Sequence, residues 1–100
     1  MRLVLSRLAL AELDEILGYI RQRSPFGARN VERRIRRAFE HISRYPEGAE
    51  RVEQRPAVRR LPLARYPYIV YYEVEADTVT VLRILHGARR QPWRDEGSGR

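Results

Sequence analysis

The strongest constraint on the fold is a pair of apolar stripes at helical spacing in the first half of the chain. The first stripe recurs every three or four residues, and its members are Ala9, Leu13, Ile16, Leu17 and Ile20. Ser6 precedes it and can cap a helix, because its hydroxyl can accept a hydrogen bond from a first-turn N–H. The second stripe follows Ser24-Pro25, a cap with proline at the first helical position, and comprises Ala28, Val31, Ile35, Ala38, Phe39 and Ile42. We therefore expect two amphipathic helices packed as an antiparallel hairpin.

After Pro46-Glu47-Gly48, which ends the second helix, short segments rich in β-branched and aromatic residues predict strands. We expect strands over residues 57–63, 68–74 and 78–85, with a tight turn at Glu75-Ala76-Asp77. Residues 1–5 alternate weakly and predict a further short strand. The last two strands carry apolar residues in both alternating sets, which is typical of strands covered on two faces. Two helices cover one face only, so a partner or a second copy is expected on the other.

Length and composition narrow the class of protein. A chain of 100 residues has room for one domain with a modest core, which we expect over residues 1–94, before a polar, glycine-rich and mobile tail at 95–100. No apolar run approaches the roughly 20 residues that a membrane helix needs, so no membrane partner is expected. The absence of cysteine excludes disulfides and thiolate chemistry and weakly favours the cytoplasm. Only His41 and His86 are present, far apart and without clustered carboxylates, so we expect neither metal nor cofactor.

The charge points to an anionic partner. The formal net charge is +7, and all 20 basic residues are arginine. Guanidinium groups suit phosphates and carboxylates, so nucleic acid or an acidic protein is implied. The absence of lysine excludes a Walker-type phosphate loop and a Schiff-base mechanism. The alternative is that codon usage accounts for the arginines, which then only solvate the surface.

Three segments resemble the RelE/ParE family of toxins from bacterial type II toxin–antitoxin modules. They are Val58-Arg-Arg-Leu-Pro-Leu63, Tyr66-Pro-Tyr-Ile-Val-Tyr-Tyr-Glu-Val74 and Leu82-Arg-Ile-Leu-His-Gly-Ala-Arg89. The resemblance covers about residues 4 to 93. It implies an α+β fold of order β-α-α-β-β-β, in which an N-terminal strand and a helix hairpin join a mostly antiparallel four-stranded sheet. The concave face opposite the hairpin then meets the cellular target.

The resemblance implies one of two functions. ParE-like toxins inhibit DNA gyrase without known nuclease chemistry, whereas RelE-like toxins are endoribonucleases that cleave mRNA in the ribosomal A site. Both kinds inhibit growth, and both are neutralised by a cognate antitoxin whose disordered C-terminal part folds on the toxin. We expect the ParE-like function, of the kind found in plasmid-stabilization modules, and keep the RelE-like function as the alternative.

Metal-free RNA cleavage needs a base, an acid and cations around one phosphate, and the candidates are His86, Arg60, Arg65 and Arg83. Among these only His86 titrates near neutral pH. Where the RelE-like pattern carries a catalytic arginine in its third strand, this chain has Ile69, which can neither bind phosphate nor move a proton. This departure favours binding over catalysis.

We expect eight residues to contact the target or the antitoxin: Arg60, Arg65, Tyr68, Tyr71, Arg83, His86, Arg89 and Arg90. The side of the sheet on which Arg83 lies stays open. A turn of three residues near Ala76 directs its side chain to the target face, and a turn of two directs it to the helices. Arg89 and Arg90 follow Gly87, where the chain can turn away from the last strand.

Overall fold

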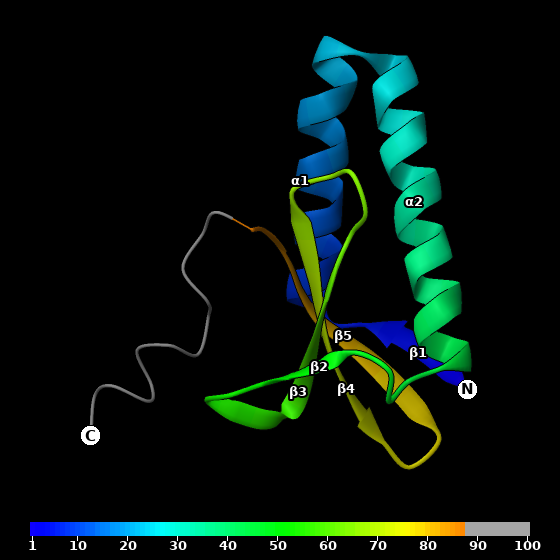
Figure 1. Ribbon diagram of the computed structural model, residues 1–100. Helices are drawn as coiled ribbons and strands as arrows, with labels where there is room; N and C mark the ends of the chain where they lie inside the picture. Colours follow the sequence, from blue (N-terminus) through cyan, green and yellow to red (C-terminus); the bar gives the residue numbers. More distant parts are fainter. Residues whose placement is uncertain (88–100) are drawn as a thin grey trace.

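The computed structural model describes residues 1–87 of the chain. The elements are β1 (Arg2–Leu5), α1 (Arg7–Arg23), α2 (Pro25–Arg44), β2 (Glu50–Val52), β3 (Arg55–Pro62), β4 (Tyr68–Glu75) and β5 (Thr78–His86). The two helices form the predicted antiparallel hairpin beside the sheet (Figure 1). The α+β class and the predicted order of elements are confirmed. The short β2 was not expected, and it gives the sheet five strands where the resemblance implied four.

Single serines fix where both helices begin. The amide of Ala9 donates to Ser6 Oγ at 3.0 Å, and the amide of Gly27 donates to Ser24 Oγ at 2.9 Å, so both predicted caps are confirmed. Ser24 also ends α1, because its own amide donates to the carbonyl of Ile20 at 2.7 Å. One residue therefore separates the two helices, which run antiparallel to each other (Figure 1).

The strands lie in the order β1-β5-β4-β3-β2, and every neighbouring pair is antiparallel except β1 and β5. Glu75 pairs with Thr78, so a two-residue turn joins β4 to β5. Tyr72 pairs with Val81 but Tyr71 pairs with Arg83, which leaves Leu82 as an extra residue in β5. This β-bulge shifts the register of the end of β5 by one residue.

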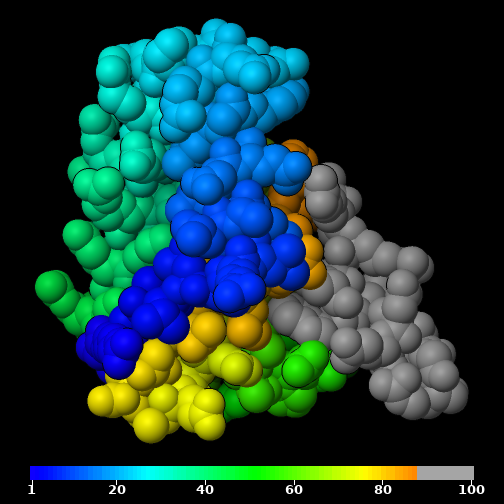
Figure 2. Space-filling view, turned by 180° about the vertical axis from the view of Figure 1, so that it is seen from behind, coloured from blue at the N-terminus to red at the C-terminus, as the bar shows by residue number. Residues whose placement is uncertain are grey.

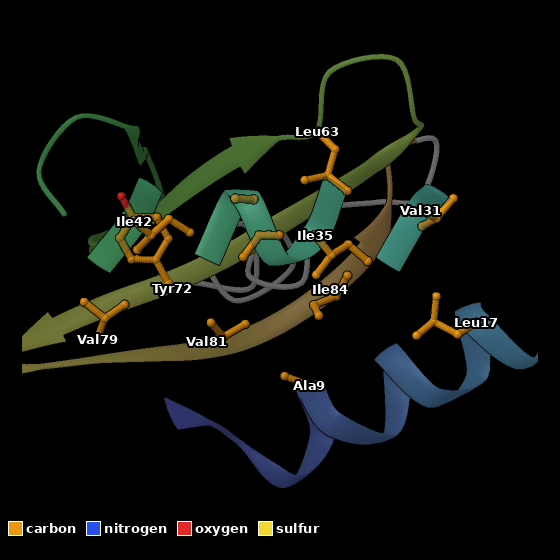
Figure 3. Packing of buried hydrophobic residues seen from close by; sticks show 12 residues of the cluster. Ala9, Leu17, Val31, Ile35, Ile42, Leu63, Tyr72, Val79, Val81 and Ile84 are labelled. Carbon is orange, nitrogen blue, oxygen red and sulfur yellow. The ribbon is translucent and has the colours of Figure 1, made fainter. Parts of the chain in front are cut away.

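The main core lies between the hairpin and one face of the sheet (Figure 3). Its buried members are Ala9, Leu17, Val31, Ile35, Ala38, Ile42, Leu63, Val70, Tyr72, Val79, Val81 and Ile84. Tyr72 is fully buried, and its hydroxyl donates to the carbonyl of Pro46 at 2.7 Å. Burial raises the pKa of Tyr72 above its ordinary 10.0, and the nearby Arg59 guanidinium opposes this rise. The tyrosine thus ties β4 to the segment that follows α2.

A second, smaller core occupies the opposite face of the sheet. It comprises Val52, Val58, Ile69, Tyr71 and Leu85, with Leu82 packed against them. Because successive strand residues point to opposite faces, Ile69 and Tyr71 face away from the hairpin while Val70 and Tyr72 face it. Both faces of the sheet are therefore apolar, as the sequence predicted. No helix of the described residues is long and apolar enough to cross a membrane.

Candidate functional site

Three residues that the sequence selected lie in one row across the sheet. Arg60 of β3 pairs with Tyr71 of β4, and Tyr71 pairs with Arg83 of β5. We call these residues the Arg60–Tyr71–Arg83 row. Tyr71 is buried in the second core, so the row belongs to the face that the helices leave uncovered. By backbone register, the two arginines flank a tyrosine on the face where the target was expected.

The charged side chain of Arg60 is partly buried. Its side chain is 25% exposed, and its Nη1 atom donates to Glu50 Oε1 of β2 at 3.2 Å. Its Nε atom is buried and has no hydrogen-bond partner in the described part of the chain. A buried donor without an acceptor is costly and commonly marks a functional position. The part of Arg60 that a partner can reach is therefore the rest of its guanidinium group, since the side chain is 25% exposed.

Arg83 is held by a residue that the sequence did not select. Its Nε and Nη2 atoms donate to Glu12 Oε2 of α1 at 2.9 and 2.7 Å. The other oxygen, Glu12 Oε1, accepts the backbone amide of Ile84 at 2.9 Å. The side chains of Arg83 and Glu12 are 26% and 11% exposed, so the ion pair is largely shielded from water. Sequence spacing gives no sign of this contact, since the partners are 71 residues apart.

Two features, the β4–β5 turn and the bulge at Leu82, together decide on which side of the sheet Arg83 lies. The turn has two residues, Ala76 and Asp77, which alone would place Arg83 on the helix side. The bulge at Leu82 then moves its backbone opposite Tyr71, on the other face. From there the guanidinium reaches Glu12, so its side chain is nevertheless bound to α1.

Two further selected residues, Tyr68 and His86, meet where β4 begins and β5 ends. Tyr68 pairs with His86, and their rings meet edge to face with centroids 5.7 Å apart. Arg65 lies exposed in the preceding loop, with a left-handed φ of 74°. Tyr68 and His86 also line a groove of about 470 Å³ against α1, together with Glu12, Glu15 and Tyr19. Tyr68 and His86 therefore lie beside α1 and not in the row.

The position expected for a catalytic arginine is part of the second core. Ile69 is only 8% exposed and packs with Val58, Tyr71 and Leu85. No group of three or more histidine, cysteine or acidic residues within residues 1–87 could hold a metal ion. Arg89 and Arg90 lie outside the described residues, as does the predicted tail.

A helix hairpin on one face of a mostly antiparallel sheet is the architecture that the resemblance to RelE/ParE toxins implied. The family model described as "ParE toxin of type II toxin-antitoxin system, parDE" matches residues 3–91. The chain therefore belongs to the ParE toxin family, within the wider ParE/RelE superfamily. Membership implies an antitoxin partner.

Similar proteins agree with this assignment. The chain is 36% identical over 84 residues to "Putative toxin Y4kP" of Sinorhizobium fredii, an alignment that covers 84% of this chain and 85% of the relative. It is also 36% identical over 81 residues to "Toxin RelE2" of Caulobacter vibrioides, covering 81% and 89% of the two chains. A chain of the chromosomal ParDE toxin–antitoxin system from P. aeruginosa shares the fold with a TM-score of 0.75 and 28% identity, covering 86% of this chain and 95% of that one.

Proposed function

We propose that this toxin inhibits DNA gyrase by binding it, carries out no nuclease chemistry, and is neutralised in the cytoplasm by a cognate antitoxin. The observation that carries the proposal is the separation of the nuclease candidates. The Arg83 side chain is paired with Glu12 on α1, the Arg60 side chain is paired with Glu50 on the edge strand β2, and His86 lies in the groove beside α1.

RNA cleavage would require His86 and the candidate arginines to lie around the same phosphate group. Cleavage of RNA without a metal needs a proton acceptor, a proton donor and cations within hydrogen-bond reach of a single phosphate. Arginine stays protonated in proteins, so the proton transfer would have to involve His86. His86 shares a face with Tyr68, whereas Arg60 shares the other face with Tyr71. An apolar Ile69 then fills the position where RelE-like toxins place an arginine.

The same residues are better suited to binding a protein target than to cleaving RNA. Arginine and tyrosine are enriched at the centres of protein interfaces, where planar side chains supply both apolar area and hydrogen bonds. The row offers the partly exposed guanidinium group of Arg60 beside the apolar second core, in which Tyr71 is buried. We include Arg65, Tyr68 and His86 as further contacts of the target or the antitoxin, together with Arg89 and Arg90.

The alternative is a ribosome-dependent endoribonuclease, which is favoured by the likeness to a relative named RelE2. Purified toxin should be added to a gyrase supercoiling reaction and, in parallel, to a reconstituted translation reaction that reports mRNA cleavage. We expect loss of supercoiling, restored by the antitoxin, and intact mRNA. Arg60→Ala should weaken this inhibition, and Arg2→Ala, an exposed arginine of β1, is the matched control. Codon-dependent mRNA cuts with unaffected supercoiling would establish the endoribonuclease instead.

A further inference from the structure

Five exposed arginines form a continuous stripe on α2: Arg29, Arg33, Arg36, Arg37 and Arg44. At about 100° per residue they fall within an arc of about 100° on the helix surface. The buried residues of α2, which include Val31 and Ile35, lie on the opposite side. At about 1.5 Å per residue the stripe is about 22 Å long. We call it the α2 arginine stripe.

Acidic partners neutralise little of this stripe. Arg36 forms a weak pair with Glu32 at 3.5 Å, in which both side chains are at least half exposed. Arg33 donates to the uncharged amide oxygen of Asn30 at 3.3 Å. Among the described residues, Arg29, Arg37 and Arg44 have no carboxylate within ion-pair distance. In the same arc the described chain has one acidic residue, Glu40.

The stripe does not serve the stability of the helix. Arg29, Arg33 and Arg37 follow one another at intervals of four residues, and like charges at this spacing destabilise a helix. The helix is instead stabilised by its buried face and by the Ser24 cap. Figure 2 shows α2, in cyan and green, along one side of the molecule, where several of its side chains project separately. The arginines therefore remain available to a ligand.

We propose that the α2 arginine stripe binds the phosphate backbone of duplex DNA. A protein partner would require apolar anchors at the centre of the contact, and the arc holds arginines and Glu40 apart from Phe26 at one end. A polyanion requires only regularly spaced cations, and duplex DNA presents one charge per about 1.7 Å of its axis. Arginine also contacts phosphate oxygens in a bidentate manner. This inference goes beyond gyrase inhibition and does not depend on it.

The test measures fluorescence anisotropy of two labelled DNA duplexes of unrelated sequence, with the full-length toxin and without gyrase, across a series of salt concentrations. We expect similar affinity for both duplexes and a steep loss of affinity with salt. Arg33→Glu plus Arg37→Glu should weaken binding by about tenfold or more and reduce the slope of log K against log salt by about two. Arg33→Gln plus Arg37→Gln should lower the slope similarly with a smaller loss of affinity.

The matched control is Arg7→Glu plus Arg21→Glu, which makes the same charge change at exposed positions of α1. It should weaken binding by less than about threefold, since only long-range attraction is lost. Circular dichroism melts must show all variants folded. Equal losses in the α2 and α1 variants, or salt-independent binding, would overturn the proposal. A loss of antitoxin affinity in the α2 variant without a loss of DNA affinity would also overturn it, by identifying an acidic protein as the ligand.

Discussion

Arg83 of β5 donates two hydrogen bonds to a single oxygen of Glu12 on α1, and this ion pair connects the helix hairpin to the sheet. The same carboxylate accepts the amide of Ile84, so Glu12 makes three hydrogen bonds to β5. β1 pairs with β5 only as far as Leu5 and Val81. Beyond that point Glu12 takes the place of a strand partner, because its oxygen satisfies an edge amide that β1 cannot reach.

We expect Glu12→Gln to lower the free energy of unfolding by about 1–3 kcal/mol. The neutral amide has one oxygen for donors that the carboxylate served with two, and it leaves Arg83 without a counter-charge in a largely shielded site. Urea denaturation at pH 7 measures the change. Glu15→Gln, at an exposed position of the same helix, is the control and should change stability by less than about 0.5 kcal/mol.

A double-mutant cycle separates the ion pair from other effects of the substitution. Arg83→Met should also destabilise the protein, because it leaves Glu12 partly buried and unpaired. The variant with both substitutions should be more stable than the sum of the two single changes predicts. Strict additivity would show that the pair contributes nothing beyond each residue's own packing.

Tyr72→Phe should change the dependence of stability on alkaline pH. Burial raises the pKa of Tyr72 in the folded protein. This shift therefore contributes its full stabilisation to the free energy of unfolding below about pH 10, the pKa of tyrosine in the unfolded chain. The contribution is lost as the pH rises through the pKa of Tyr72 in the folded protein. The phenylalanine variant should lose about 1 kcal/mol at pH 7, with the hydrogen bond to Pro46, and then fall less steeply above pH 10 than the wild type. Chemical denaturation at pH 7, 9.5 and 11 measures both effects.

Tyr45→Phe is the control for this comparison, because Tyr45 is 57% exposed. Its alkaline slope should match that of the wild type. If Tyr72→Phe also retained the full slope, the buried hydroxyl would not be the group responsible.

Ala76→Gly should stabilise the hairpin between β4 and β5 by about 0.5–1 kcal/mol. Ala76 has a φ of 56°, in the left-handed region that disfavours a residue with a Cβ. Glycine removes this strain at the first position of a two-residue turn. Thermal melts measure the gain. Ala57→Gly, an exposed position within β3, is the opposite control and should be destabilising, since glycine weakens a strand.

The helices were predictable because their signals are local. Each has an apolar stripe at regular spacing and a serine cap, and both caps occur as predicted. The boundaries of β4 and β5 also lie within one residue of the prediction, because long β-branched and aromatic runs leave little alternative. β2 was missed because Glu50-Arg-Val52 has neither length nor apolar alternation, and its place depends on pairing with β3.

The candidate site was only partly predictable because it depends on register and on distant residues. Arg60, Tyr71 and Arg83 were selected from the resemblance, but only the pairing of three strands shows that they form a row. The bulge at Leu82 has no marker in the sequence. Glu12 was not selected from the sequence, because it lies off the apolar stripe of the first helix. Its role follows from the packing of α1 against β5.

His86→Ala should leave growth inhibition within about threefold of the wild type. The side chain lies beside Tyr68 in the groove along α1, on the side of the sheet away from Tyr71 of the row, so its loss removes at most a peripheral contact. If His86 were a general base or acid, its loss would instead lower the rate by roughly 10²–10⁴-fold. Induced expression with colony counts measures toxicity, and antitoxin binding by the variant reports its folding. A folded, non-toxic His86→Ala variant, together with ribosome-dependent mRNA cuts by the wild type, would reject gyrase inhibition by binding in favour of the endoribonuclease.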